Sequence, residues 1–451
     1  MTRLSLATLA LLVALPAAAA EFQIRSDTIG DFYGTLRSDG EEISRRRLHQ
    51  MLGLDVFDLS GDGSNDLFFV SSFRFDSDLG IAQEELDRVG QLRRERVSIM
   101  YAYFEARELL GFLGIRLGRQ MEIDAVDMLL WDGLKLRFDT PWYFGVETLV
   151  GVEARNDFGP LTTSSFEGDG RREGDLLMDG SFGDVSPGLV WGGSIYLRDL
   201  TWTHLAVTFR EIRNTDDDDI EQRRLAVAFQ QRIQDWLFVE GTASYDFFLE
   251  LGNEYRAALR FRPVDWFDGR VQYHYLLPSF SADSIFNVFS WRPINRAEGT
   301  GTFDVGHGLT VYGGGYASFL ETDALGEKVT DRMVQDTGIQ AGARWVPGPE
   351  GQVWLDAQTQ FGYGGDQTFV SAGAEWWFLE RTLGVDGRVV LILWDDQVQQ
   401  NLEGTLFGVQ AGGTWQFVQG GKLRLLVEEA TTELQPSWFR AMGMVEISRW
   451  L

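Results

Sequence analysis

The stretch from Asp235 to Leu251, DWLFVEGTASYDFFLEL, alternates between two kinds of side chain and decides the fold. One parity is apolar or small and comprises Leu237, Val239, Gly241, Ala243, Tyr245, Phe247 and Leu249. The other parity is mostly polar and includes Glu240 and Asp246. A period of two indicates a β-strand whose faces meet different surroundings. Such segments recur about every twenty residues almost to Leu451, too many for the core of a soluble sandwich. They predict an all-β fold, a closed transmembrane antiparallel barrel with an apolar outside and a polar lumen.

The first twenty residues have the pattern of a secretion signal. Arg3 supplies a positive start, Leu4–Leu15 an apolar segment, and Ala17–Ala20 a small-residue cleavage site. An apolar segment of this length is too short to cross a bilayer of about 30 Å as a helix. We therefore expect residues 1–20 to be removed, residues 21–451 to form the barrel, and the protein to reside in the cell outer membrane.

The strand count follows from the connections. Short ones, such as Gln234–Asp235 and Pro263–Phe267, alternate with longer ones, such as Ile81–Leu92 and Glu122–Asp132. This asymmetry is typical of outer-membrane barrels, with short periplasmic turns and long extracellular loops. With Phe22–Leu36 as the first strand the best count is 22, and even numbers from 18 are compatible. Both termini are then expected in the periplasm.

Aromatic residues, 13% of the chain, gather near the strand ends. Eight tryptophans lie by the short turns, namely Trp142, Trp202, Trp236, Trp266, Trp345, Trp376, Trp377 and Trp415. Three lie by the long loops, namely Trp131, Trp394 and Trp438. Two aromatic girdles at the membrane interfaces would give this distribution.

Composition argues against several functions. The chain has no cysteine, which excludes disulfides, thiolate metal sites and covalent c-type haem. Its four histidines are scattered without a catalytic or metal-binding spacing, so we expect no enzyme activity, no metal and no cofactor. Asp58–Asp66 resembles a calcium loop but has Phe69 where glutamate is expected, which favours a plain turn.

The chain is strongly acidic. Its formal net charge of −27 becomes −28 once Arg3 leaves with the signal, because no acidic residue lies in that segment. A nucleic-acid partner is therefore not expected. Acidic runs such as Asp216–Asp219 either share divalent ions with lipopolysaccharide or are simply solvated loop charge.

Parity assigns the lumen side chains. Leu225, Val227 and Phe229 face lipid, so the residues between them face inward. The same reasoning on other strands gives the predicted pore-lining residues: Lys135, Arg137, Arg224, Arg232, Glu240, Asp246, Arg256, Arg260, Arg270, Asp356, Glu375, Arg388 and Arg424. The arginines from Arg224 to Arg270 are expected to form a strip that favours anions. The alternative is that lumen charges only solvate the wall and pair with each other.

A constriction is expected because barrels of about 22 strands are usually plugged. The sequence has no N-terminal plug domain, since alternation begins almost at Glu21. Asp157–Val185, 29 residues with Arg171, Arg172 and Glu173 at its middle, is the candidate. Loops of this length are usually functional or disordered, so it is either an eyelet or a surface loop.

A family resemblance lies at Gly114–Leu136, GIRLGRQMEIDAVDMLLWDGLKL. A strand ending in Leu117–Gln120, an excursion, and a return strand opening at Asp132–Leu136 resemble the early hairpin of the alginate-export family and related substrate-specific porins. The resemblance implies a monomeric outer-membrane channel with a charged lumen that passes a polyanion or small anionic nutrients. The chain departs from the family at Met121–Asp124, where further Arg and Gly are usual.

The C-terminal strand also resembles those of other outer-membrane barrels. Gly443, Val445 and Ile447 alternate outward, as in the segment that the barrel-assembly machinery recognises. The chain ends in Leu451 where Phe or Trp is usual.

Two functions fit these features. A channel for small or polymeric hydrophilic solutes, including anionic saccharides, is the first. A structural barrel that sheathes or anchors a partner, such as a cytochrome or a secretion complex, is the second. We favour the channel because the short turns leave little periplasmic surface for a partner.

Overall fold

The computed structural model of the protein describes residues 21–36, 42–59, 66–80, 95–154, 188–198, 200–215, 219–248, 250–277, 293–320, 333–362, 365–395, 404–432 and 438–450. The predicted signal, the predicted constriction loop with Arg171, Arg172 and Glu173, the first three residues of the Asp216–Asp219 run and most of the calcium-like loop lie outside these residues.

The described residues form 22 strands in one antiparallel sheet. They are β1 Glu21–Leu36, β2 Glu42–Phe57, β3 Leu67–Asp78, β4 Glu95–Leu109, β5 Leu113–Ile123, β6 Met128–Asp139, β7 Phe144–Glu153, β8 Gly188–Leu197, β9 Thr203–Asn214, β10 Ile220–Gln234, β11 Leu237–Asp246, β12 Leu251–Val264, β13 Phe267–Leu276, β14 Ile294–Gly306, β15 Leu309–Leu320, β16 Met333–Gly348, β17 Gly351–Gly362, β18 Gly365–Phe378, β19 Leu383–Asp395, β20 Gly404–Val418, β21 Gly421–Thr432 and β22 Trp438–Trp450. Within the described ranges no helix is long and apolar enough to span a membrane.

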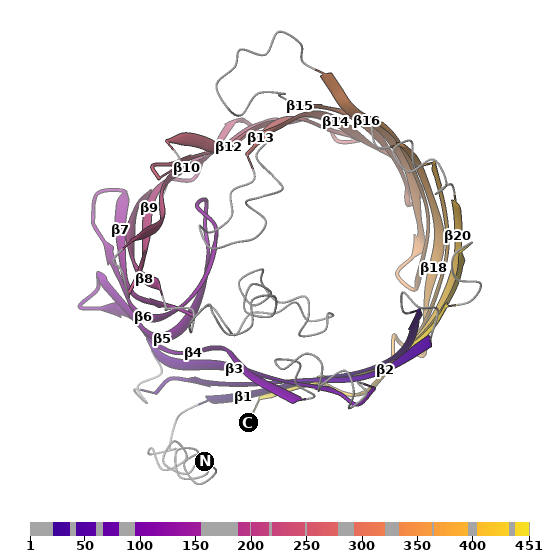
Figure 1. The fold of residues 1–451 in the computed structure, drawn as a ribbon, viewed down its shortest axis with the longest axis horizontal. Helices are drawn as coiled ribbons and strands as arrows, with labels where there is room; N and C mark the ends of the chain where they lie inside the picture. Colours follow the sequence, from indigo (N-terminus) through magenta and orange to yellow (C-terminus); the bar gives the residue numbers. More distant parts are fainter. Residues whose placement is uncertain are drawn as a thin grey trace.

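The sheet closes on itself. Each strand pairs with the next along the chain, and β22 pairs with β1 from Gln23 opposite Trp450 to Tyr33 opposite Arg440. Figure 1 shows the strands as a ring, in which the indigo strands of the start of the chain meet the yellow strands of its end. The predicted barrel and its best count of 22 are confirmed. Closure leaves no free sheet edge, so every strand has a hydrogen-bonding partner on both sides.

The two faces of the wall differ in chemistry. On β12 the outer parity carries Tyr255 and Leu259, whose apolar side chains are exposed, while Arg256 and Arg260 lie on the other parity. Ion pairs on that second face join strands that are not neighbours, as in the contact of Arg424 on β21 with β19. Only the concave side of a closed sheet brings such side chains together. The ion-paired face therefore faces the lumen.

The outer face carries ion-paired charges on β5, β6, β9 and β10. Arg119 pairs with Asp132 there at 2.6 Å, and both belong to the parity of the exposed Leu117. Glu211 is almost fully buried between two arginines on the same face. The sequence analysis expects an apolar outer face, and these charged side chains interrupt it.

One glycine of the Gly-Arg-Gln segment has a backbone role. Gly118 lies at a φ of +127°, and a Cβ built there would be 2.3 Å from the carbonyl oxygen of Ala102 on β4. Only glycine tolerates both conditions. The segment is therefore held by strand geometry, with Arg119 directed outward and Gln120 bonded to Gly133 O at 3.0 Å on the lumen side.

The tryptophans by the short turns and those by the long loops differ in exposure, and the girdle by the short turns stays a prediction. Seven of the eight tryptophans near short turns are exposed: Trp142, Trp202, Trp236, Trp266, Trp345, Trp376 and Trp415. Trp377 instead donates to Glu375 on the lumen face at 2.7 Å. Trp131, Trp394 and Trp438 also share the parity of lumen side chains, so these three do not form the second girdle. Proximity to a strand end sets the depth of a side chain, whereas parity sets its direction.

Candidate functional site

The turn between β5 and β6 bends over the lumen. Asp124 of this turn accepts a hydrogen bond from Arg210 on β9 at 2.6 Å, and Asp127 lies 3.3 Å from Arg224 on β10. Strands β9 and β10 are several strands away around the wall, so the turn must cross the lumen to reach them. Figure 1 shows a hairpin beside the β5 and β6 labels reaching into the ring. The sequence predicts an extracellular excursion over Glu122–Asp132, whereas the strands continue to Ile123 and restart at Met128.

An apolar cluster lies beneath the turn. Leu129 and Trp131 of β6 pack against Val190 of β8 and Ile212 of β9, and all four are buried. Val126 in the turn itself is also buried. Burial of this much apolar surface within the lumen stabilises the inward position, at about 25 cal/mol per Å² removed from water. The turn is thus a packed part of the wall that narrows the lumen.

The arginine that anchors the turn is deeply buried. Arg224 and Asp246 form an ion pair at 2.9 Å, and each side chain is only 4% exposed. A buried ion pair requires good geometry and further hydrogen bonds to offset the loss of hydration. Arg224 has both, because Asp127 provides a second carboxylate. Its guanidinium is therefore part of the structure and does not stand free in the lumen.

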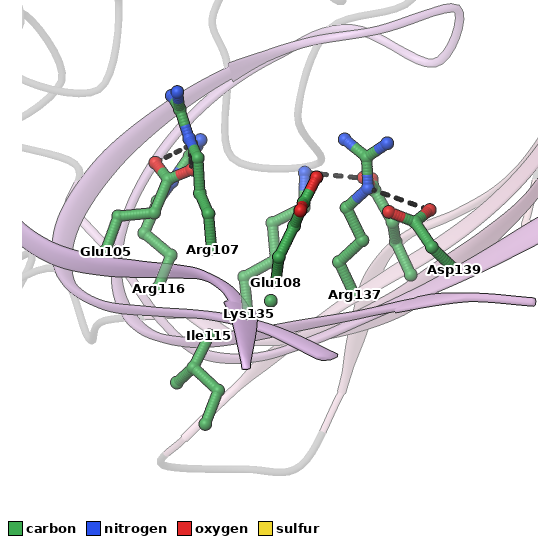
Figure 2. A pocket seen from close by; sticks show the side chains of 10 residues that line it. Glu105, Arg107, Glu108, Ile115, Arg116, Lys135, Arg137 and Asp139 are labelled. Atoms are coloured by element: carbon green, nitrogen blue, oxygen red, sulfur yellow. Dashed lines mark hydrogen bonds and ion pairs between the residues drawn. The ribbon is translucent and has the colours of Figure 1, made fainter. Parts of the chain in front are cut away.

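A second feature is a cavity of about 320 Å³ on the lumen side of β4–β7. Its charged lining residues are Glu105, Arg107, Glu108, Arg116, Lys135, Arg137, Asp139 and Glu147. Figure 2 shows most of these side chains pointing to one side of the wall, while Ile115 points the opposite way. Lys135 contacts Glu122 and lies 2.9 Å from Glu147, and Arg116 lies 2.8 Å from Glu105. The cavity is lined by both signs of charge.

Two arginines of this cavity keep hydrogen-bond donors available. Arg107 donates through Nε to Glu105 at 2.9 Å, and Arg137 donates through Nε to Asp139 at 3.2 Å. The guanidinium of Arg107 lies over the ring of Phe68, and that of Arg137 over the ring of Tyr196. Within the described ranges their Nη atoms bind no carboxylate. Such pre-positioned guanidinium groups suit two-point binding of a carboxylate.

The predicted arginine strip is mostly neutralised. Arg232 pairs with Asp235 at 2.6 Å, Arg260 with Asp268 and Arg270 with Glu240, both at 2.5 Å. Arg256 differs, because its polar contact is with Gln272 at 3.5 Å, and it forms no ion pair with any described residue. The alternative that lumen charges pair with each other therefore describes most of this strip.

The remaining predicted residues also lie on the ion-paired face. Arg424 lies 3.4 Å from Asp386, Glu375 accepts a hydrogen bond from Gln352 at 2.6 Å, and Asp356 stands opposite Ser371 in register. Arg388 contacts the hydroxyl of Ser371 at 3.5 Å. That these residues line a conducting pore stays a prediction.

Sequence reasoning missed the residues that dock the turn. Arg210 is 1% exposed and 86 positions from Asp124, a separation that no local pattern reveals. The departure at Met121–Asp124 from the alginate-export pattern was the available signal, since it introduces the acidic residue that Arg210 binds. Among the described residues no group of three or more His, Asp or Glu side chains is arranged to hold a metal ion.

Comparison with known proteins gives similarity in fold. No family model and no curated protein matches the chain. Solved structures with a similar chain path include OccAB4 of Acinetobacter baumannii, at 8% identity and a TM-score of 0.48 over 97% of this chain and 100% of that one. A BenF-like porin of Pseudomonas fluorescens has 8% identity and a TM-score of 0.47 over 97% of this chain and 100% of that one. OpdK of Pseudomonas aeruginosa, solved with vanillate, has 9% identity and a TM-score of 0.46 over 96% of this chain and 99% of that one. The resemblance of Gly114–Leu136 to the alginate-export family stays a prediction.

Proposed function

We propose that the protein is an outer-membrane channel for small or polymeric hydrophilic solutes that carry a carboxylate. The observation that carries this proposal is the closed barrel of 22 strands, with exposed apolar side chains outside and ion pairs inside. A closed sheet satisfies all its backbone hydrogen bonds internally, which is the condition for a β-structure to lie in lipid. The signal that the sequence predicts over residues 1–20 supports export, and the chain acts as a monomer in this proposal.

The preference for anions rests on particular guanidinium groups and not on the whole strip. Arg107, Arg137 and Arg256 expose donors that no described carboxylate occupies. A uronate passing along the lumen would meet these donors one after another. Sites that are repeated and weak allow a solute to enter and still leave. The solute class therefore extends to anionic saccharides, including the alginate-like polymers that the family resemblance implies.

The deciding experiment is conductance of the purified protein in a planar bilayer. A channel gives discrete current steps, and glucuronate added to one side should reduce the mean current more than glucose does. A matched pair of variants locates the effect: Arg137→Gln should weaken block by glucuronate, whereas Arg381→Gln, in an exposed turn, should not. A protein that inserts but never conducts would favour the structural barrel that needs a partner.

The orientation in the membrane is tested separately. Asp265 lies in the turn between β12 and β13 and is fully exposed, and Asp217 lies in the long connection after β9. On intact cells an impermeant thiol reagent should label an Asp217→Cys variant and leave Asp265→Cys unlabelled. The native chain has no cysteine, so the background is low. The reverse labelling pattern would overturn the placement of short turns in the periplasm.

A further inference from the structure

A second cavity, of about 500 Å³, lies on the lumen side of β19–β22. Its floor is apolar and is formed by Val390, Ile392, Leu406, Ala430 and Trp438. Apolar side chains that contact only water do not stabilise the wall, because about 25 cal/mol of stabilisation per Å² is obtained only when the apolar surface is removed from water. Cavities of about 300–1,000 Å³ with apolar walls and a few polar groups are typical ligand sites.

Two opposite charges stand at the edge of this cavity. Arg388 on β19, Gln410 on β20 and Glu428 on β21 are consecutive partners in one row of the sheet. The Nε atom of Arg388 is buried and has no hydrogen-bond partner in the described part of the chain, and its Nη2 donates to the Ser371 hydroxyl only at 3.5 Å. Glu428 accepts a single long hydrogen bond, from Gln410 at 3.4 Å. Within the described ranges neither charge belongs to an ion pair.

The neighbouring cation Arg440 acts on Glu428 through space, but among the described residues the two side chains form no direct ion pair. Arg440 stands opposite Glu428 in register, but it donates two hydrogen bonds of 2.9 Å to the two carboxylate oxygens of Asp31. Arg388 and Glu428 are therefore a separated pair of opposite charges beside an apolar floor. Most other lumen charges, such as Arg260 with Asp268, meet directly.

The spacing suits a small zwitterion. Neighbouring strands are about 4.8 Å apart, so residues two strands apart are separated by about 9.6 Å. The charged ends of an α-amino acid are about 3 Å apart, and a hydrogen bond of about 2.9 Å at each end extends this to about 9 Å. Carboxylate and ammonium can then meet Arg388 and Glu428 at the same time, while the side chain lies on the floor.

We propose that this cavity binds an α-amino acid with an apolar side chain. The carboxylate binds Arg388, the ammonium binds Glu428, and the side chain packs on Val390, Leu406 and Trp438. The proposal names a solute for the channel and rests on that proposed function. A carboxylate without an ammonium group would leave Glu428 without a partner and would be repelled by it. A saccharide would leave the apolar side chains of the floor exposed to water.

The test is calorimetric titration of the purified protein in lipid nanodiscs with four probes. L-phenylalanine should bind at least about tenfold more tightly than 3-phenylpropionate, which lacks the ammonium, or phenethylamine, which lacks the carboxylate. Glycine, which lacks the apolar group, should also bind at least about tenfold more weakly than L-phenylalanine. Equal affinity for L-phenylalanine and glycine would overturn the proposal.

Variants assign the binding to this cavity. Gly408→Leu fills it without a clash, because a Cβ there would meet Ala430 and Leu406 at 3.7 Å, and should abolish phenylalanine binding. Gly387→Leu makes the same change on the outer face of β19, with its nearest contact also at 3.7 Å, and should leave binding intact. Phenylalanine binding that survives Gly408→Leu would overturn the assignment.

Charge variants separate the two ends of the ligand. Arg388→Gln should weaken binding of L-phenylalanine and 3-phenylpropionate and spare phenethylamine. Glu428→Gln should weaken binding of L-phenylalanine and phenethylamine and spare 3-phenylpropionate. Heat-modifiability on gels checks that each variant is folded. The binding test and the conductance test are independent. Selective binding without current would overturn the channel and support the amino-acid site. Current without selective binding would support the channel and overturn the site.

Discussion

The lumen has two contrasting regions, which we call the charged wall, the inner face of β4–β10, and the apolar pocket, the cavity on β19–β22 described above. On the charged wall Arg224 is buried between Asp246 and Asp127, and its charge holds the β5–β6 turn. In the apolar pocket Arg388 and Glu428 stand apart, and no carboxylate or cation of the described residues forms an ion pair with either. The difference shows that a charge in this lumen supports the structure where it is paired and buried, and is available to a solute where it is not.

The largest expected effect is on assembly of the barrel. It tests whether the outer face faces lipid behind both regions. Val227→Arg behind the charged wall and Val389→Arg behind the apolar pocket should both hinder assembly, since arginine near the midplane of a barrel costs about 2–4 kcal/mol. Gln230→Arg, on the lumen side of β10, should be tolerated. The measurement is heat-modifiability on gels, and a normal shift for either valine variant would contradict the outward direction of that strand.

The next largest effect is on the free energy of unfolding, which should differ between buried and exposed ion pairs. Asp246→Asn removes the nearer of the two carboxylates that pair with the buried Arg224, and should lower the free energy of unfolding by about 3 kcal/mol. Asp386→Asn removes the partner of Arg424, whose side chain is 37% exposed, and should cost less than about 1 kcal/mol. Urea unfolding in lipid vesicles measures both, and equal losses would remove the distinction between structural and available charges.

A smaller effect concerns the docked turn. The double variant Asp124→Asn, Asp127→Asn weakens the contacts to Arg210 and Arg224, and should raise the ratio of released to docked turn by about tenfold. Single-channel recordings should then show longer visits to a higher current level. Asp265→Asn, which alters an exposed turn, is the control and should leave the current unchanged. An unchanged current in the double variant would mean that the turn does not restrict the lumen.

The smallest expected effect is on ion selectivity. Arg256→Ala removes a guanidinium without an ion pair, whereas Arg260→Ala removes one already paired with Asp268. The reversal potential under a salt gradient should therefore move toward cation preference for Arg256→Ala, because local charge selects permeating ions. Arg260→Ala exposes Asp268 and should move the potential in the same direction. If neither variant moved it, lumen arginines would have no part in selectivity.

Much of the fold could be predicted because alternation is a local property. Leu225, Val227 and Phe229 specify the outward face of one strand without reference to any other. Repeated along the chain, such segments and the alternating short and long connections led to 22 strands, and the boundaries of the first strand agree with the structure to one residue. The candidate site was predictable only in part, because parity placed Lys135 and Arg256 on the inner face but gave no information on their partners.

What the sequence by itself determined is therefore the barrel, its strand number and the face on which each side chain lies, since these depend on a period of two within single strands. Only the tertiary structure decided which charges are neutralised and that Asp124 and Asp127 reach β9 and β10. The physical reason is distance along the chain: an ion pair or an apolar cluster joins strands that closure of the barrel brings together, and no local pattern encodes that meeting.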